Sequence, residues 1–229
     1  MSWMAAWLRG QRQATSFYLV VSNVAGIMQT PTHFLIAGAL AVPARRHLIG
    51  NTPALLLGAV LPDIPFALLT LWGLFYYRWI APLPQPGVIM EYLHFTLYFT
   101  DPIWIAGHNF FHSLVVDGLL FAVGLWGWRH RQRWGVPLTW LATSMLLHVT
   151  IDIFTHHSDG PLIWWPVNWS YRFASPISYW EVAYGGATFA RAELILNVLL
   201  STYLLTALWP QIKQQFLRWQ ASAGSRQVR

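Results

Sequence analysis

The 229-residue chain contains no cysteine and few charged residues. Without cysteine it can form neither a disulfide framework nor a thiolate metal site, so a bound metal would need His, Asp, Glu or backbone oxygen ligands. Only 10% of the residues are charged, whereas 55% are hydrophobic and 15 are tryptophan. This composition excludes an ordinary soluble domain and predicts a single membrane-embedded domain, with the lipid bilayer as its partner.

The net charge of +6 does not indicate a nucleic-acid-binding protein, and no nucleic acid partner is expected. The basic residues stand at the ends of apolar runs rather than along one solvated stripe. Such residues are retained on the cytoplasmic side of a membrane. We therefore expect Arg45 with Arg46, the turn at 129–133 and the tail from Lys213 to face the cytoplasm.

The apolar runs predict an all-α fold, a polytopic transmembrane helical bundle of about five spans. A crossing takes roughly 20 residues, and four runs qualify, at 52–77, 102–128, 136–156 and 191–209. A fifth run at 32–44 is short and crosses only if its helix is tilted. The intervening segments 78–101 and 157–190 then face outward, and their tryptophans and tyrosines suit the headgroup zone. The segment 157–190 is the Trp-rich outward loop.

Ionisable residues inside these spans come in groups, although each costs at least about 2.5 kcal/mol near the membrane midplane. His108 and His112 are four residues apart, as are His148 and Asp152. Residues four apart on a helix differ by about 40° around its axis, so each pair can reach one point. Asp117, five residues past His112, points about 140° away and is left out of the group.

The predicted topology brings these groups together in the outward half of the membrane. His33 stands at the outer start of the 32–44 helix. Pro62 and Pro65 should break the 52–77 helix around Asp63, whose carboxylate can then point into the same cavity. Imidazole and carboxylate are ligands that suit zinc and similar metals. A proton or ion relay and a structural hydrogen-bonded network remain alternatives.

Ordered motifs between residues 28 and 185 resemble the YdjM-like family of inner-membrane proteins, which are expected to be metal-dependent hydrolases. The segments that carry the resemblance are THFLIAGAL, LPDIP, HNFFHSLV and HVTIDIFTHH, and they place the family pattern on His33, Asp63, His108 with His112, and His148 with Asp152. The family is also distantly similar to zinc-dependent phospholipase C enzymes. The resemblance implies an integral protein of the bacterial inner, or plasma, membrane.

Two features depart from the family pattern. The family's LPD motif tends to carry a second aspartate where this chain has Pro65, so a second metal would lack that ligand. Family sequences also tend to begin near the THF segment, which suggests Met28 as the initiator. We accordingly expect residues 1–27 to be an extra helix or a mis-assigned start, 28–210 to be the membrane-embedded hydrolase domain, and 211–229 to be a basic cytoplasmic tail.

The motifs and the resemblance together predict a membrane-bound, metal-dependent hydrolase of phosphate esters, with phospholipids as one substrate class. One or two zinc-like ions would lower the pKa of a bound water toward about 7, so that hydroxide attacks phosphorus. The expected metal ligands are His33, Asp63, His112, His148 and Asp152. His108 and His156 are expected to complete the shell or to act as general acid and base.

The outward loop supplies two further candidates. Arg172 can hold a phosphate through two parallel hydrogen bonds, although an interfacial arginine that touches lipid headgroups fits the sequence equally well. Glu181 is a weaker candidate ligand on the same loop.

The rival reading is a non-enzymatic membrane protein, in which the His/Asp cluster binds or transports metal or protons, or stabilises the bundle. A carrier needs a polar path to the cytoplasmic side. The inner segments 119–128 and 137–146 are nearly devoid of one, which favours a one-sided site.

Overall fold

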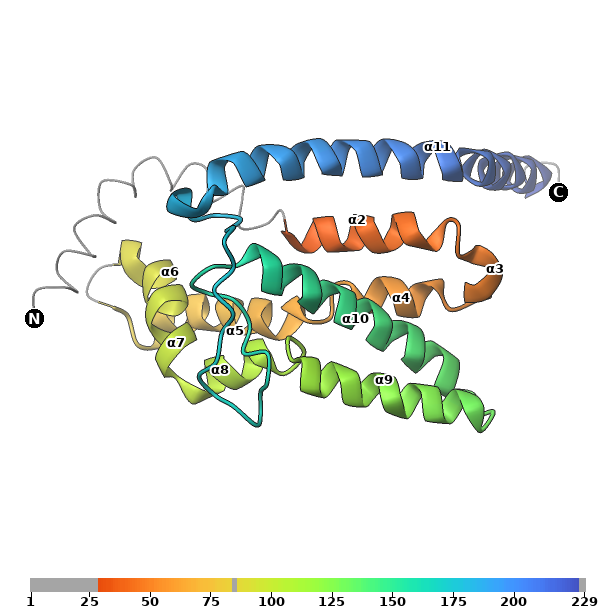
Figure 1. Ribbon diagram of the computed structural model, residues 1–229. Helices are drawn as coiled ribbons and strands as arrows, with labels where there is room; N and C mark the ends of the chain where they lie inside the picture. Colours follow the sequence, from red (N-terminus) through yellow and green to blue (C-terminus); the bar gives the residue numbers. More distant parts are fainter. Residues whose placement is uncertain (1–28, 84–85, 227–229) are drawn as a thin grey trace, which may run out of the picture.

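The computed structural model describes residues 29–83 and 86–226, and every regular element within them is helical (Figure 1). The α-helices are α2 (Gln29–Ala41), α3 (Arg45–Leu48), α4 (Thr52–Gly58), α5 (Asp63–Phe75), α6 (Ile89–Tyr92), α7 (Tyr98–Thr100), α8 (Pro102–Asn109), α9 (Leu114–Arg129), α10 (Gly135–Thr155) and α11 (Gly186–Arg226). Two π-helical segments, η1 (Tyr76–Ile80) and η3 (Leu93–Leu97), and two 3-10 turns, η2 (Pro86–Val88) and η4 (Val182–Tyr184), complete the set. The predicted all-α class is confirmed.

Two helices, α10 and α11, are long and apolar enough to cross a membrane by themselves. Two more spans result if each bent pair counts as one crossing, namely α4 with α5 and η1, and α8 with α9. The described residues thus contain two to four candidate spans, and these match the four long runs expected from the sequence. The short fifth run corresponds to α2, whose 13 residues fall below the length of a crossing, so the count of five is not confirmed.

Both bent pairs turn sharply, and only one of the bends was predicted. The α4–α5 pair bends by 52° around Pro62, as the two prolines require. The α8–α9 pair bends by 42°, which corrects the expectation of one continuous helix over 102–128. Here α8 ends at Asn109 and Ser113 starts a new helix, because its hydroxyl accepts hydrogen bonds from the first backbone N–H groups of α9.

The centre of the bundle is formed by α10, which packs between α4 and α9. These contacts are close because glycine lies at them. A Cβ atom on Gly58 of α4 would lie 2.2 Å from the carbonyl oxygen of Leu141, and one on Gly124 of α9 would lie 2.7 Å from the backbone nitrogen of Thr139. Small residues at such contacts let helix backbones approach closely, which is how helices associate inside a membrane.

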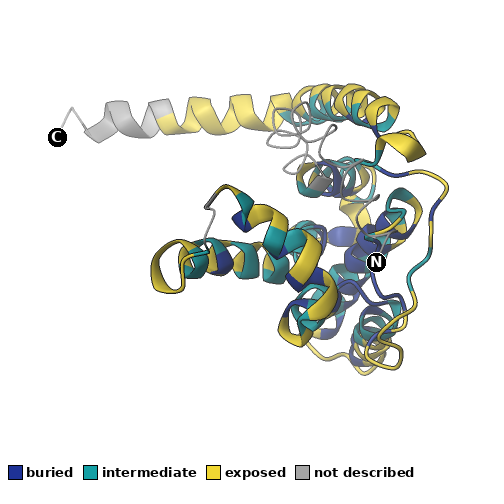
Figure 2. Cartoon of the chain, turned by 90° about the vertical axis from the view of Figure 1, so that its left-hand side faces the viewer, coloured by how far each residue is buried: buried dark blue, intermediate teal, exposed yellow. Residues whose placement is uncertain are grey.

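The longest helix, α11, runs along α2 on the outside of the bundle (Figure 1). Its side chains are mostly exposed, in contrast to the buried centre (Figure 2). The helix continues to Arg226, so residues 211–226 of the predicted tail are helical. The predicted extension at 1–27 lies outside the described residues.

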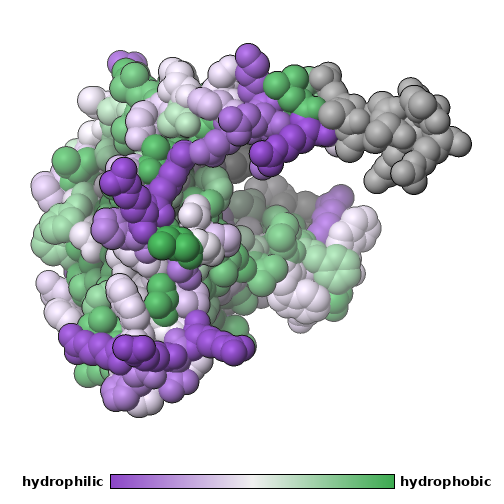
Figure 3. All heavy atoms as spheres, turned by 90° about the vertical axis from the view of Figure 1, so that its right-hand side faces the viewer, coloured by the Kyte–Doolittle hydropathy of each residue, from purple (hydrophilic) through white to green (hydrophobic). Residues whose placement is uncertain are grey.

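The three basic segments, at 45–46, at 129–133 and from Lys213 onward, lie at one end of the molecule. That end carries α3, the turn between α9 and α10, and the distal part of α11 (Figure 1). Seen from this end, hydrophilic residues form bands across the surface (Figure 3). The grouping agrees with a common side for all three, and its cytoplasmic assignment stays a prediction.

The long segment between α10 and η4 contains the Trp-rich loop and crosses the break between α8 and α9. The backbone N–H of Leu114 donates to the carbonyl of Ile163 at 3.1 Å, and the Ser113 hydroxyl donates to the carbonyl of Trp165. Ile163 also packs against Val149 of α10. The segment is therefore attached to the same part of the bundle in which the predicted His and Asp residues lie.

Candidate metal centre

Two histidines and two aspartates meet where the bent spans break. Asp63 is the first residue of α5, His112 lies in the break between α8 and α9, and His148 and Asp152 lie one turn apart on α10. One ligand atom from each residue lies within 4.8 Å of all the others. Four of the five predicted ligands therefore form one compact, largely buried group that could hold a metal ion.

The spacing of these ligand atoms fits a small cation. The Nε2 atoms of His112 and His148 are 3.2 Å apart. Each also lies between 3.1 and 3.5 Å from Oδ1 of Asp63 and Oδ2 of Asp152. A tetrahedron with metal–ligand bonds of about 2.0–2.1 Å has edges of about 3.3–3.4 Å. These five separations are close to this edge length, and the sixth, between the two carboxylate oxygens, is within 4.8 Å, so a zinc-sized ion could be held with a small adjustment of the carboxylates.

The hydrogen bonds of the two imidazoles also fit a metal. Nδ1 of His112 lies 2.8 Å from the carbonyl oxygen of His108, and Nδ1 of His148 lies 2.8 Å from that of Ala59. A carbonyl only accepts, so both Nδ1 atoms carry hydrogen and both Nε2 atoms can present a lone pair. Two facing lone pairs 3.2 Å apart repel each other unless a cation or a proton lies between them.

Helix α2 contributes the outer contacts of this group. The Thr30 hydroxyl donates to Oδ2 of Asp63 at 2.5 Å. His33 lies with its Nε2 3.0 Å from Oδ1 of Asp152, and its ring stacks on His148 at 3.8 Å between centroids. Each aspartate thus turns one oxygen toward α2 and the other toward the histidines. The structure places His33 outside the group of four, next to one of its carboxylates.

A second layer of rings lies beside His112. His108 stacks on it at 4.5 Å, and Tyr98 lies 4.8 Å from His108. The Nδ1 atom of His108 is buried without a hydrogen-bond partner among the described residues. His156 caps the end of α10, where its Nδ1 donates to the carbonyl of Asp152 at 3.0 Å, and its ring contacts Tyr179.

Arg172 lies beyond this ring layer. Its guanidinium donates to the Tyr98 hydroxyl at 3.3 Å and to the carbonyl of Gly160, and lies over the rings of Tyr98 and Phe99. Burial raises the pKa of Tyr98 and of the nearby Asp159 above their ordinary values. Arg172 thus places a cation beside the ring layer, held by Tyr98 and Gly160.

The chain also matches a known protein family. A family model described as the YdjM inner membrane protein matches residues 28–216. The chain belongs to the YdjM inner membrane protein family. The YdjM match contains all four residues of the central group, and it extends past residue 185, where the motifs that suggested the family end. No match was found among curated proteins or solved structures.

Within this YdjM chain, Asp117 lies outside the group of four, as predicted from helical phase. That prediction assumed a continuous helix, whereas Asp117 lies in the first turn of the separate helix α9. The side chain is fully buried, and neither carboxylate oxygen has a hydrogen-bond partner among the described residues. Glu181, the weaker candidate, accepts hydrogen bonds from the backbone and hydroxyl of Ser158 on the loop.

Sequence reasoning missed the polar partners on α2 and α11. Thr30 and Thr32 occupy the first turn of α2, and Glu193 and Asn197 lie on α11. Threonine is common at the start of a helix, so Thr30 and Thr32 did not stand out as partners of the site. The residues they contact are also far away in sequence. One signal could have revealed these contacts. Glu193 lies in the first half of an apolar helix, where a carboxylate requires a polar partner.

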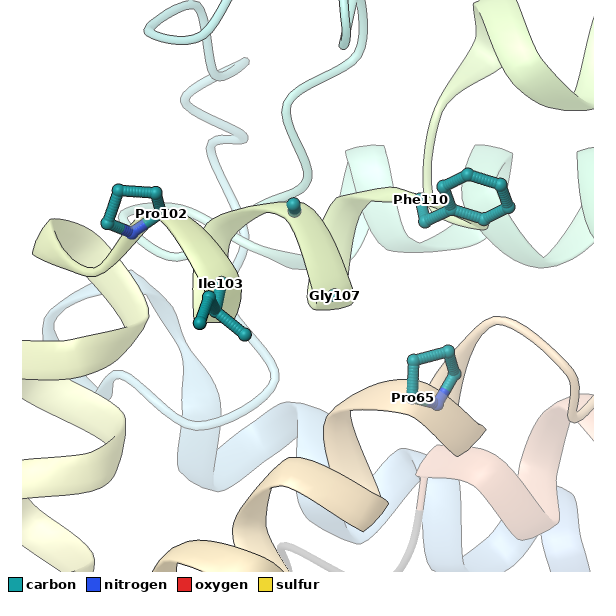
Figure 4. A pocket seen from close by; sticks show the side chains of 6 residues that line it. Pro65, Pro102, Ile103, Gly107 and Phe110 are labelled. Carbon is teal, nitrogen blue, oxygen red and sulfur yellow. The ribbon is translucent and has the colours of Figure 1, made fainter.

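An apolar groove of about 560 Å³ lies between α5 and α8, close to the two breaks (Figure 4). It is lined by Pro65, Pro102, Ile103, Ala106, Gly107 and Phe110. Pro65 lies two residues after Asp63, and Phe110 lies two residues before His112. The groove is therefore next to the metal-binding group along both chain segments.

Proposed function

We propose that this YdjM protein is a membrane-bound metal-dependent hydrolase of phosphate esters, in which Asp63, His112, His148 and Asp152 hold a divalent, zinc-like ion. The observation that carries the proposal is the approach of the two Nε2 atoms to each other and to one oxygen of each aspartate, at separations of 3.1–3.5 Å. The hydrogen bond of each Nδ1 to a backbone carbonyl fixes the histidine tautomers. A bound ion of this kind supplies the Lewis acidity that activates water near neutral pH.

Asp63 marks the side from which substrate reaches the group. Its side chain is 29% exposed, whereas the side chain of His112 is 1% exposed and that of Asp152 is 6% exposed. Four tight protein ligands would fill a tetrahedral site, and catalysis needs an open position. We assign that position to the Asp63 side, which is the most exposed part of the group.

The surrounding residues have defined tasks in this proposal. Arg172 binds the phosphate oxygens, because Tyr98 and the Gly160 carbonyl fix its guanidinium and leave N–H donors for a ligand. His108 and His156 hold or deliver the proton that the leaving oxygen requires when its bond to phosphorus breaks. His33 orients Asp152.

The apolar groove between α5 and α8 favours lipid over soluble esters. A hydrocarbon chain would fit its lining, and the adjacent Asp63 would then lie near the headgroup. We propose that the site faces outward and that the basic end faces the cytoplasm. Because the chain has no cysteine, single cysteines placed at the basic end and in the Trp-rich loop can test this orientation with an impermeant thiol reagent.

Metal analysis of detergent-purified protein tests the proposal. Wild type should carry metal, whereas His148→Ala and Asp152→Ala should lose it. Asp117→Asn is the matched control, because Asp117 is an equally buried carboxylate outside the group, and it should keep the metal. Equal and negligible metal in all four proteins would exclude the site.

Hydrolysis assays then separate an enzyme from a binding protein. Release of phosphate-containing product from a phospholipid and from a generic phosphodiester should stop when a chelator is added and return with zinc. Arg172→Lys should raise KM more than it lowers kcat, since lysine keeps the charge but cannot form two parallel hydrogen bonds. Metal binding without turnover of either substrate would favour the rival function.

That rival is a structural or proton-binding His/Asp network, and one observation supports it. The same separations of 3.1–3.5 Å suit ion pairs between protonated histidines and the aspartates. In that case each Nε2 carries hydrogen and the lone-pair repulsion disappears without any metal. Retention of full stability after exhaustive chelation would favour this arrangement.

A further inference from the structure

A second polar cluster joins α2 to α11. The hydroxyl of Thr32 donates to Oε1 of Glu193 at 2.6 Å, and Nδ2 of Asn197 donates to the hydroxyl oxygen of Thr32 at 2.9 Å. Thr32 and Glu193 are 8% and 7% exposed. Glu193 and Asn197 lie one turn apart on α11, so both reach the same threonine.

These side chains are unusual for their helix. Along α11 the neighbouring residues are strongly exposed, with Leu194 at 54% and Ile195 at 61%. A lipid-facing helix has little reason to carry a carboxylate and an amide one turn apart, because polar groups in hydrocarbon are unfavourable unless they are paired. Both groups point at α2, the element on which α11 mainly packs.

The first turn of α2 connects this cluster to the metal-binding group. Thr30 and His33, three residues apart, face the bundle and contact Asp63 and Asp152. Thr32 lies between them in sequence and faces α11 instead. Helix α2 is thus hydrogen-bonded on one side to α11. On its other side it contacts the oxygen of Asp63 and of Asp152 that points away from His112 and His148.

We propose that Glu193 and Asn197 are positioning residues of the metal centre. By fixing Thr32 they set the place of α2, and through Thr30 and His33 they set the direction of the two ligand carboxylates. Removal of outer-shell contacts of this kind typically weakens metal binding 10- to 100-fold. The inference rests on the metal-binding half of the proposed function and is independent of hydrolysis.

Cobalt titration of the purified protein in detergent tests the proposal, because Co²⁺ reports both affinity and ligand geometry through its visible absorption. Glu193→Leu should weaken Co²⁺ binding by about tenfold or more and change the absorption spectrum. Glu193→Gln keeps an oxygen acceptor for Thr32 and should remain within about twofold of wild type in affinity, with the wild-type spectrum. Leu199→Ala, an exposed position on the same helix, should behave as wild type.

Thr32→Val provides a second variant of nearly unchanged shape, and it should weaken Co²⁺ binding in the same direction as Glu193→Leu even if the latter folds poorly. Circular dichroism should show wild-type helix content in each protein that is titrated.

Three outcomes would overturn the proposal. Wild-type affinity and spectrum in both Glu193→Leu and Thr32→Val would show that α11 does not position the site. Two ions per wild-type chain, one of them lost in Glu193→Gln, would make Glu193 a ligand instead. Absence of Co²⁺ binding by wild type would overturn this inference together with the proposed metal site.

Discussion

Helices α10 and α11 are both long and apolar enough to cross a membrane, yet they differ greatly in burial. In an apolar stretch of 18 consecutive residues in each helix, 44% of the residues are buried in α10 and 6% in α11. The first helix packs between α4 and α9 and carries His148 and Asp152, whereas the second packs mainly on α2. Hydropathy therefore identifies both as candidate spans, and only their buried polar residues show which one forms the site.

The largest expected difference between the two helices is how far substitutions in each change the dependence of the unfolding free energy on bound metal. Removal of metal should lower the free energy of unfolding by about 2.7 kcal/mol when the starting concentration is about 100 times the dissociation constant. Detergent-based unfolding with and without chelator measures this change. Asp152→Ala on α10 should abolish the chelator effect, while Val198→Ala on α11 should preserve it. A chelator effect that persists in Asp152→Ala would remove α10 from the site.

The second-largest effect on stability is expected where α10 packs closely against α4. Gly58→Ala places a methyl group against the backbone of α10, 2.2 Å from the Leu141 oxygen, and should cost about 1–3 kcal/mol of unfolding free energy. Gly118→Ala is the matched control, because nothing lies within 4 Å of its Cβ position. Denaturation curves of the two variants should therefore diverge, and superimposable curves would contradict the close approach of α4 to α10.

A smaller effect is expected at Ser144 of α10. Its hydroxyl is buried without a hydrogen-bond partner among the described residues. Ser144→Ala should therefore raise the unfolding free energy by about 1 kcal/mol, since an unsatisfied buried polar group is removed. Thr143→Ala, which removes a hydroxyl that donates to the carbonyl of Thr139, should not stabilise the protein. Loss of stability in Ser144→Ala would show that this hydroxyl has a partner in the membrane.

The smallest effects belong to the lipid-facing side of α11. Val198→Ala and Leu199→Ala change side chains that are 58% and 61% exposed, and each should alter the unfolding free energy by no more than about 0.5 kcal/mol. The same unfolding assay measures them. A loss of several kcal/mol at either position would mean that this face of α11 is covered by protein rather than lipid.

Much of the site could be predicted because its signals are local. Apolar run length identified the candidate spans, and the spacing of four residues placed His148 and Asp152 on one helix face, where the structure has them 3.1 Å apart. The proline pair at 62 and 65 located the first bend. Each of these inferences needs only helix geometry and a short stretch of sequence.

The remainder depended on contacts between distant residues. The second bend carries no proline, and its one local signal, Ser113 ahead of an apolar run, was overlooked as a helix start. The contacts of Thr30 with Asp63 and of Thr32 with Glu193 join residues 33 and 161 positions apart. No local periodicity specifies such pairs, so the sequence predicted helix α2 only as a marginal fifth span and did not predict its contacts with the two carboxylates.

The two bends also explain why each imidazole presents the same nitrogen to the centre. In an unbroken helix the carbonyl of Ala59 would accept from the N–H of Asp63, but that N–H donates to Val60 instead. Likewise the N–H of His112 donates to Asn109 and leaves the carbonyl of His108 free. Each helix break thus leaves one carbonyl oxygen without its usual backbone donor, and that oxygen accepts a hydrogen bond from a histidine Nδ1 instead. A mutation that straightened either helix would reclaim that oxygen and free the imidazole to turn its hydrogen toward the ion, so cation binding could fail while the bundle stayed folded.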